Sequence, residues 1–527
     1  MVDLIGNRTL PTLLAEQAER RGDAEALVFE DSAGAVRRFT YTELEAAAAS
    51  TAAGLAELGV RAGDKVVLHL SNRPEVVFTI FGLARLGAVA VPSNTANRAQ
   101  EMLHLIAFSD AKLLVTSPDH LSLFDAVLPR TPAIEQVVVA GGDGAPGDHV
   151  DFAELLRAAP LTGVAVTDPE TPLEILFTSG TTALPKGVVL THANWLWSGE
   201  RTSRGLRLDE TDRMLTALPL FHVNAQSLTL MNALTLGATA VVVEQFSAGR
   251  FMDQVRRHGA THTSIVAMVV RTLLAQPPSD ADRDHALRRV SYAINVSVAE
   301  KEAFERRFGV ELLNGYGLSE AMTEVSVCPV GGPGRWPSIG LPAMDRQIRL
   351  VDASGHEVAQ GEIGEITVKG VPGRTIMKEY YKDPEATART ISDGWLSTGD
   401  NGYLDELGYL YFFDRAKDII KRAGENVSAS EVEAALAEHP LIARAAVIGV
   451  PDAMRDEAVM AFVVLEPGAS LARDDVERHC ALRLARFKVP TIVEFTDALP
   501  MTSIGKIEKH KLRALAAAGA AAAVVTS

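Results

Sequence analysis

The stretch Phe177-Thr-Ser-Gly-Thr-Thr-Ala-Leu-Pro-Lys186-Gly-Val-Val-Leu-Thr-His192 is the most informative part of the sequence. Its six residues 178–183 hold four hydroxyl side chains and one glycine, and Lys186 follows three positions later. Hydroxyls and unhindered backbone N–H groups bind phosphate oxygens, and a lysine adds a positive charge. No glycine directly precedes Lys186 and no Ser or Thr directly follows it, so this is not a Walker A loop. The stretch predicts a phosphate-binding loop of another kind.

Short apolar runs and helical patterns alternate from about residue 65. Residues 65–70 and 88–92 have the pattern of strands, and 74–86 that of a helix with Pro74 at its start. Further apolar runs follow at 112–115, 136–140, 238–243 and 289–294. Apolar strands separated by helices indicate an α/β domain of mainly parallel sheets covered by helices.

The pattern changes near residue 400 to a mixed succession of strands and helices. We therefore expect a large N-terminal domain over 1–414, a junction at 415–418 and a small α+β domain over 419–513. Residues 514–527 are mostly Ala and Val, and we expect a frayed tail there.

The composition excludes several classes of protein. The chain has 527 residues, with 51 Lys plus Arg against 67 Asp plus Glu, a net charge of −16. This balance argues against nucleic-acid binding and against a polybasic membrane anchor. The two cysteines, Cys328 and Cys480, can build neither a disulfide framework nor a cysteine zinc site, and they fit a reducing cytosol.

One uncharged run raises the question of a membrane span. Residues 226–243 contain no charged side chain over 18 positions. The run includes Gln226, Asn232 and Gly237 and ends in three valines, so a buried helix followed by a strand is the better interpretation. Residues 1–22 lack a basic segment followed by an apolar core, so we expect no secretory signal and a cytoplasmic protein.

Five further motifs follow in a fixed order. They are Leu218-Pro-Leu-Phe-His222-Val-Asn, Asn314-Gly-Tyr316-Gly-Leu-Ser319-Glu320, Gly394-Trp-Leu-Ser-Thr-Gly-Asp400, Asp414-Arg415-Ala-Lys417 through Asn426, and Leu499-Pro-Met-Thr-Ser-Ile-Gly505-Lys506-Ile. With the 177–192 stretch, this series resembles the adenylate-forming, AMP-binding family of acyl-CoA synthetases, peptide-synthetase adenylation domains and luciferases. The resemblance covers essentially the whole chain. It departs from the family at Ala183, where the loop usually has glycine.

The resemblance implies a site for magnesium ATP. The residues expected at the phosphates are Thr178, Ser179, Gly180, Thr181, Thr182, Lys186 and Ser319. Glu320 would bind Mg²⁺, for which a carboxylate is a suitable hard ligand. Asn314, Gly315 and Tyr316 would lie at adenine, and Asp400 and Arg415 at the ribose.

The resemblance also implies an acyl pocket and a moving small domain. His222, Val223, Asn224 and Asn295 would line the pocket, although a lone histidine is as often a packed core residue. Lys506, in a stretch rich in turn formers, would bridge the carboxylate and the α-phosphate during adenylation. Rotation of the small domain about Lys417 would then move Lys506 away from the site. It would bring in the residues expected to serve the reaction with coenzyme A, which are Lys421, Gly424 and Asn426.

The predicted activity is that of an acid–thiol ligase, an acyl-CoA synthetase that uses ATP, Mg²⁺ and coenzyme A. Five segments, 335–340, 371–380, 421–428, 455–458 and 487–490, resemble the branch of bacterial crotonobetaine/carnitine–CoA ligases. A trimethylammonium substrate needs a carboxylate or an aromatic cage, and residues 220–227 offer Phe221 and His222 but no acid. We therefore predict a small or aromatic carboxylate substrate. A homodimer is one expectation for the assembly, with no nucleic acid and no membrane span.

Three alternatives stay open at this point. The first is an adenylating enzyme with a non-CoA acceptor or with nitrite, like the ATP-dependent diazotases of secondary metabolism. The second is a non-catalytic protein that keeps the nucleotide fold, against which Lys186, Glu320, Asp400 and Lys506 argue. The third is a dinucleotide oxidoreductase.

Three patterns in the sequence are rejected as sites. The oxidoreductase interpretation rests only on Gly142-Asp-Gly-Ala-Pro-Gly147, where Pro146 stands at the point at which a helix would open. His258 and His262 are four apart but have no evident third ligand, so a metal site is not expected there. No G-x-S-x-G elbow occurs, which disfavours an α/β-hydrolase.

Overall fold

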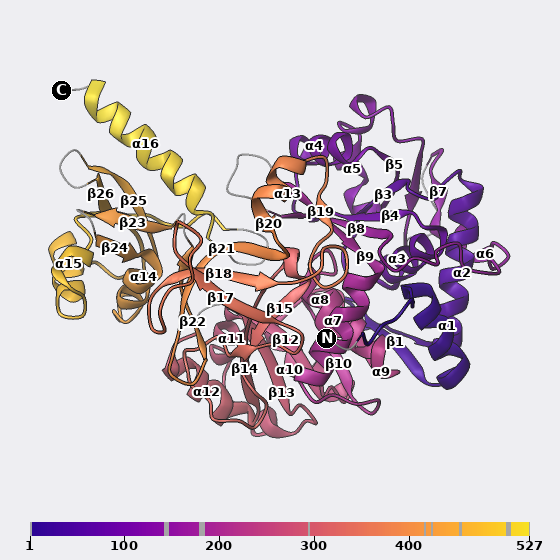
Figure 1. The fold of residues 1–527 in the computed structure, drawn as a ribbon, viewed down its shortest axis with the longest axis horizontal. Coiled ribbons are helices and arrows are strands. Elements are labelled where there is room, and N and C mark those ends of the chain that lie inside the picture. The colour runs from indigo at the N-terminus through magenta and orange to yellow at the C-terminus, as the bar shows by residue number, and fades with distance from the viewer. Residues whose placement is uncertain are drawn as a thin grey trace. The chain divides into compact units, whose positions relative to one another are not determined.

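The chain forms two compact units. The computed structural model describes residues 3–141, 147–178, 185–293, 296–415, 418–422, 425–452, 456–501 and 507–525, without the side chains of 415, 421, 425, 426, 456 and 519–525. The large unit comprises Met1–Arg349, Thr367–Thr398 and Leu407–Leu410, and the small unit Leu350–Ile366, Gly399–Glu406 and Tyr411–Ser527. Figure 1 shows the elements along the chain.

The first sheet of the large unit has eight strands. Their order is β19 (Glu379–Tyr380), β9 (Lys186–Thr191), β8 (Pro172–Thr178), β4 (Val89–Pro92), β3 (Lys65–His69), β5 (Ala111–Thr116), β6 (Gln136–Val139) and β7 (Val150–Asp151). From β8 to β7 the neighbours run parallel, whereas β9 pairs antiparallel with both β8 and β19. The predicted phosphate stretch thus begins in β8 and returns in β9.

The second sheet of the large unit has nine strands. Their order is β16 (Leu341–Pro342), β15 (Thr323–Val327), β14 (Glu311–Leu318), β13 (Arg289–Ala293), β12 (His262–Val266), β10 (Arg213–Thr216), β11 (Thr239–Val243), β1 (Glu25–Glu30) and β2 (Val36–Thr40). The strands from β14 to β1 are parallel, and β15, β16 and β2 add antiparallel edges.

Helices cover both sheets. They are α1 (Leu10–Arg21), α2 (Tyr41–Glu57), α3 (Pro74–Leu86), α4 (Ala99–Ser109), α5 (Leu121–Phe124), α6 (Phe152–Arg157), α7 (His192–Gly205), α8 (Val223–Ala225), η3 (Gln226–Met231), α9 (Asn232–Leu236), α10 (Ala248–Arg257), α11 (Ala267–Leu274), α12 (Val298–Phe308) and α13 (Pro384–Thr390). The start of α7 follows from its sequence, because the Thr191 hydroxyl accepts from the Asn194 N–H at 3.1 Å and the Asn194 amide oxygen accepts from the Thr191 N–H. This capping box fixes the direction in which the chain leaves β9.

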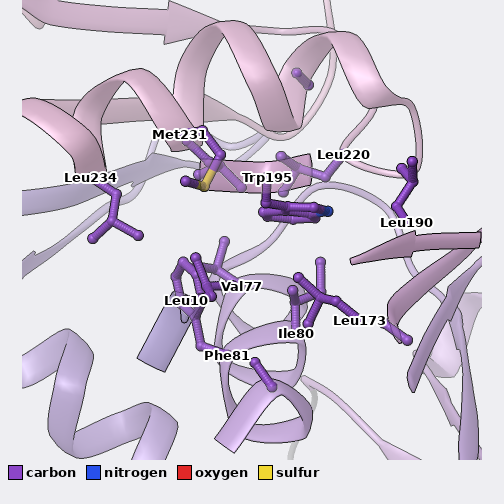
Figure 2. Packing of buried hydrophobic residues seen from close by; sticks show 14 of the residues in the cluster. Leu10, Val77, Ile80, Phe81, Leu173, Leu190, Trp195, Leu220, Met231 and Leu234 are labelled. Atoms are coloured by element: carbon purple, nitrogen blue, oxygen red, sulfur yellow. The ribbon is translucent and has the colours of Figure 1, made fainter. Parts of the chain in front are cut away.

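One apolar core joins the two sheets. It contains Leu173 of β8 and Leu190 of β9 together with Val242 of β11 and residues of α3 and α7, which therefore lie between the sheets (Figure 1). Figure 2 shows Trp195 of α7 in the middle of this core, among the leucines, Val77 of α3 and Met231. Because Trp195 is fully buried, its large apolar surface contributes strongly to holding the sheets together.

The small unit has its own sheet and its own core. The sheet has the order β24 (Glu425–Ser428), β23 (Ile419–Arg422), β26 (Asp456–Leu465) and β25 (Ile442–Asp452), and β27 (Ile492–Phe495) pairs with β26. Three helices accompany it, which are α14 (Ala429–Ala437), α15 (Arg473–Ala481) and α16 (Lys509–Val525). Between 347 and 415 lie β17 (Gln347–Val351), β18 (Gly364–Lys369), β20 (Ile391–Ser392), β21 (Trp395–Leu404) and β22 (Leu410–Arg415).

The predicted α/β class with mainly parallel sheets is confirmed, as is the helix-then-strand interpretation of 226–243. No helix among the described residues is long and apolar enough to span a membrane. The expected frayed tail is wrong over 514–525, which belongs to α16, because alanine has the highest intrinsic helix propensity. The predicted domain boundaries, with a hinge at Lys417, stay predictions, and residue 417 lies outside the described part.

Candidate active site

The hairpin of β8 and β9 brings the two ends of the phosphate stretch together. Thr178 is the last residue of β8, and it pairs directly with Lys186, the first residue of β9. Both residues are half-buried. Ser179, Gly180, Thr181 and Thr182, which connect them, lie outside the described residues. The structure therefore places the lysine beside the start of the predicted phosphate loop.

A tyrosine joins Lys186 to Glu320. Tyr380 lies in β19, which adds to the edge of β9, and Tyr380 pairs with Val188. The Lys186 ammonium lies over the Tyr380 ring, 4.6 Å from its centre, where the negative face of the ring attracts a cation. The Tyr380 hydroxyl donates a hydrogen bond of 2.9 Å to Oε1 of Glu320. A cation, a neutral donor and a carboxylate thus gather at one place between the two sheets of the large unit.

The environment keeps the Tyr380 phenol protonated. Burial raises the pKa of Tyr380 above its usual value, and the neighbouring Glu320 carboxylate raises it further. A protonated phenol is a donor, so Tyr380 orients the Glu320 carboxylate and leaves its other oxygen for a further partner.

Glu320 stands in a tight turn after β14. Met322 and Thr323 have φ values of 47° and 68°, in the left-handed region that costs non-glycine residues of the order of 1–3 kcal/mol each. A Cβ on Gly317 would lie 1.9 Å from the Thr323 carbonyl oxygen, so only glycine allows the two backbones to approach. Ser319, predicted at the phosphates, directly precedes Glu320 in the same turn.

Strand β14 carries the residues predicted at adenine. The Asn314 side chain is buried and its amide donates to the Ser338 carbonyl at 2.9 Å. Gly315 and Tyr316 pair with β15, and Tyr316 is half-buried against the main core. The Asn314 amide is thus engaged within the protein, and the adenine contacts of all three residues stay predictions.

The predicted acyl-pocket residues follow a loop that is fixed from behind. Asn72 accepts from the Leu220 N–H at 2.7 Å and donates to the carbonyls of Leu218 and Val243, each at 2.9 Å. These hydrogen bonds fix the backbone just before His222, Val223 and Asn224, which lie at the start of α8. Within the described part of the chain, the Asn224 side-chain oxygen is buried and accepts no hydrogen bond. The fourth predicted pocket residue, Asn295, lies outside that part.

A buried acid supports the same loop. The Gln226 amide donates to Glu174 Oε1 at 2.6 Å and to the Leu220 carbonyl at 2.9 Å. Glu174 lies in β8 and is fully buried. Burial raises its pKa to about 8, against smaller opposing effects of Gln226 and Trp195. The segment 220–227 has no acid of its own, but Glu174 stands directly behind it.

The remaining predicted residues belong to the small unit. Asp400 lies in β21 and is buried, and Arg415 is the last residue of β22. Lys421 pairs with Asn426 in the β23–β24 hairpin, which places two of the predicted coenzyme A residues side by side. Lys417, Gly424 and Lys506 lie outside the described residues. The roles of all these residues stay predictions.

Both rejected histidines have structural partners. His258 Nε2 lies 2.6 Å from Glu30 Oε2, and His262 Nε2 lies 2.8 Å from the Ser291 hydroxyl. Over the described ranges, no three His, Cys, Asp or Glu side chains group as metal ligands.

Comparison with known proteins identifies the family. The family model of the AMP-binding enzyme matches residues 14–381, and that of the AMP-binding enzyme C-terminal domain matches residues 431–506. The chain belongs to the AMP-binding enzyme family. The predicted resemblance to adenylate-forming enzymes is therefore confirmed.

Relatives within the AMP-binding enzyme family match along nearly the whole chain. The crotonobetaine/carnitine–CoA ligase of Citrobacter koseri is 42% identical over 97% of this chain and 100% of the relative. The crystal structure of the anthranilate CoA ligase AuaEII in complex with anthranoyl-AMP matches with a TM-score of 0.89 at 28% identity, covering 98% of each chain. ATP-bound MatB from Rhodopseudomonas palustris matches with a TM-score of 0.86 at 27% identity, covering 96% of this chain and 98% of that one.

Two residues of the site were not predicted to act there. Tyr380 belongs to segment 371–380, whose sequence indicates the branch of the family and not a site, and its position beside Lys186 depends on the pairing of β19 with β9. Glu174 could have been noticed in the sequence, because it is the one charged residue in the apolar run of β8.

The hydrogen bond from Tyr380 to Glu320 leads to a testable prediction. Tyr380→Phe removes the donor that orients the carboxylate, which we expect to raise the Mg²⁺ concentration for half-maximal pyrophosphate release roughly 3- to 10-fold. The matched control is Tyr381→Phe, because the Tyr381 hydroxyl donates to Asp110 at 3.0 Å and not to Glu320. Equal magnesium requirements for the two variants would contradict this role of Tyr380.

The buried Glu174 predicts a pH dependence of stability. Its pKa is about 8 in the folded chain, against the ordinary glutamate value of 4.5, so Glu174 binds more protons when folded than when unfolded between about pH 5 and 8. Its contribution to the free energy of unfolding therefore falls as the pH rises, by roughly 1.4 kcal/mol per pH unit. Glu174→Gln removes this slope.

Urea unfolding of Glu174→Gln and of the parent should give similar midpoints at pH 5 and a higher midpoint for the variant at pH 8.5. The exposed Glu154 offers the control, since Glu154→Gln should follow the parent at both pH values. A constant difference between Glu174→Gln and the parent across this range would show that Glu174 does not change its charge there.

Proposed function

We propose that this chain is an AMP-forming acyl-CoA ligase that activates a small or aromatic carboxylate with magnesium ATP and transfers the acyl group to coenzyme A. The observation that carries the proposal is the meeting of Lys186 and Glu320 at Tyr380. It supplies a cation for phosphate and a hard ligand for Mg²⁺ beside the strand that leads into the hydroxyl-rich loop.

In the first step, a carboxylate oxygen of the substrate attacks the α-phosphorus of ATP. The bond from the α-phosphorus to the bridging oxygen breaks, and pyrophosphate leaves with the electron pair. Lys186 would bind phosphate oxygens, and Ser319 and the loop hydroxyls would donate to them. Glu320 would hold Mg²⁺, and the ion would supply positive charge to offset the charge that develops on the leaving group.

In the second step, the thiolate sulfur of coenzyme A attacks the acyl carbon, the bond from that carbon to the AMP oxygen breaks, and AMP leaves with the electron pair. In this proposal Lys506 serves the first step, and Lys421, Gly424 and Asn426 serve the second after rotation about Lys417. The pairing of Lys421 with Asn426 supports a common role, because it presents both from one hairpin.

The identity of the carboxylate is a proposal drawn from the pocket segment and from the relatives. The Asn224 oxygen provides a buried acceptor for a polar substituent such as an amine or a hydroxyl. The relatives with a crotonobetaine/carnitine name share 40–42% identity, and the anthranilate enzyme shares the fold. Small zwitterionic acids and substituted benzoates are therefore the substrates to test first.

A non-CoA acceptor or a nitrite substrate is not favoured, because the crotonobetaine/carnitine relatives and two of the matching structures, the anthranilate and benzoate enzymes, are named CoA ligases. We expect the enzyme in the cytoplasm, where ATP and coenzyme A are supplied. The homodimer stays a prediction.

Pyrophosphate release across a panel of acids tests the proposal. The panel contains crotonobetaine, carnitine, benzoate, anthranilate, short aliphatic acids and nitrite, each with and without coenzyme A, with products read by mass spectrometry. We expect a coenzyme A thioester from at least one carboxylate. A nitrite product, or an adenylate that coenzyme A does not discharge, would keep the first step and overturn the acceptor.

The role proposed for Lys506 predicts a separation of the two steps. Lys506→Ala should abolish pyrophosphate release and leave thioester formation from prepared acyl-adenylate within about 3-fold of the parent, because a lysine–phosphate contact would act in the first step only. Lys511→Ala is the control, since Lys511 is exposed and pairs with Glu508 at 2.6 Å. Equal loss of both steps in Lys506→Ala would remove the proposed role.

A further inference from the structure

The turn that carries Glu320 is held by side chains from outside it. It runs through residues 319–323 and contains the two left-handed residues Met322 and Thr323. Such a backbone persists only where its surroundings fix it.

The carbonyl groups of this segment point at donors. The Ser319 carbonyl accepts from the Met322 N–H at 3.0 Å, and the Glu320 carbonyl accepts from the Met377 N–H at 2.7 Å. Two arginines donate to three further carbonyls. Arg346 Nη2 donates to the Ala321 carbonyl, and Arg201 Nη1 donates to the Met322 carbonyl at 3.3 Å. Arg346 Nε donates to the carbonyl of Glu324, the residue that follows the turn, at 3.1 Å. Arg346 also donates from Nη1 to the Thr375 carbonyl at 2.7 Å, so the two guanidinium groups fix the turn and tie it to the segment before β19.

Both arginines are buried, and an aspartate holds them. Arg201 comes from α7 and Arg346 from the segment between β16 and β17. Asp345 forms a two-pronged pair with Arg201, with Nε–Oδ1 at 2.6 Å and Nη2–Oδ2 at 2.9 Å, and its Oδ1 lies 3.9 Å from Arg346 Nε. The side chain of Glu324 is buried beside them, so two acids face two bases.

A buried cluster of this kind is a poor source of stability. Transferring a charged group from water to the protein interior costs several kcal/mol per ion. The attraction between the buried charges often only offsets this desolvation free energy. The planar guanidinium is, however, a rigid fork of donors that fixes the directions of the groups it binds. The cluster therefore contributes mainly by fixing the orientation of the backbone groups that it binds.

We propose that Arg346, together with the Arg201–Asp345 pair, positions Glu320 for magnesium binding by holding the carbonyl groups of the turn behind it. In the described part of the structure, the hydrogen bonds of Arg201 and Arg346 to this segment go to backbone carbonyls, so the three residues act through the backbone. The inference rests on the magnesium role proposed for Glu320.

The test compares two lysine substitutions. Arg346→Lys keeps the buried charge and removes the fork that spans the carbonyls of Ala321, Glu324 and Thr375. Arg307→Lys is the matched control, because Arg307 also pairs with an aspartate, Asp282 at 2.7 Å. Like Arg346, it also donates to backbone carbonyls, those of Leu273, Leu274, Gln276 and Pro277.

Arg346→Lys should raise the Mg²⁺ concentration for half-maximal pyrophosphate release about 3- to 10-fold, whereas Arg307→Lys should leave it within about 2-fold. Glu320→Gln should also raise it, and adding Arg346→Lys to Glu320→Gln should cause no further rise. An unchanged requirement in folded Arg346→Lys, or a full additional rise in the double variant, would overturn the proposal. If Arg346→Lys does not fold, Asp345→Asn takes its place with the same expected outcomes.

A second measurement separates the failure of this inference from that of the proposed function. The Met377 N–H donates to the Glu320 carbonyl, so its hydrogen exchange reports the turn without any substrate. We expect exchange at Met377 to be at least about 10-fold faster in Arg346→Lys and unchanged in Arg307→Lys. An unchanged magnesium requirement in Glu320→Gln would refute the metal role of Glu320, and exchange at Met377 would still decide whether Arg346 fixes the turn.

Discussion

The hydrogen bond from the Tyr380 phenol to the Glu320 carboxylate is the contact on which the candidate site depends. It joins a strand at the edge of the eight-stranded sheet to a turn at the end of a strand in the nine-stranded sheet. Lys186 over the same ring adds the positive charge. Because the phenol is buried and stays protonated, the tyrosine is the hydrogen-bond donor and the carboxylate is the acceptor.

The large unit places many of its polar groups where they hold loops. Asn72 and Gln226 bond the backbone of the acyl segment, and Arg201 and Arg346 bond the backbone of the Glu320 turn. Buried polar groups of this kind add little net stability, but each leaves a costly unpaired group if its partner moves. The loops that carry the predicted chemistry are therefore held in place by buried polar partners.

Much of this arrangement was predictable and part of it was not. The strands near 65, 88, 112, 136, 238 and 289 were found because buried parallel strands are continuous apolar runs. The expectation that Lys186 binds phosphate followed from the motif around it, whereas its position at the start of β9 is known only from the structure. The approach of Tyr380 to Glu320, 60 positions apart, did not, because it depends on β19 pairing with β9 across the chain. The Arg201–Asp345 pair spans 144 positions and leaves no periodic signal.

The sequence by itself determined the family, the class of fold, the chemical types at the site and the order of the motifs, because these depend on local residue pattern and spacing. Only the tertiary structure decided which side chains meet: Tyr380 with Glu320, Glu174 with Gln226, and two arginines with the carbonyls of one turn. Such contacts join distant segments through sheet pairing and core packing, and a single sequence carries no local record of either.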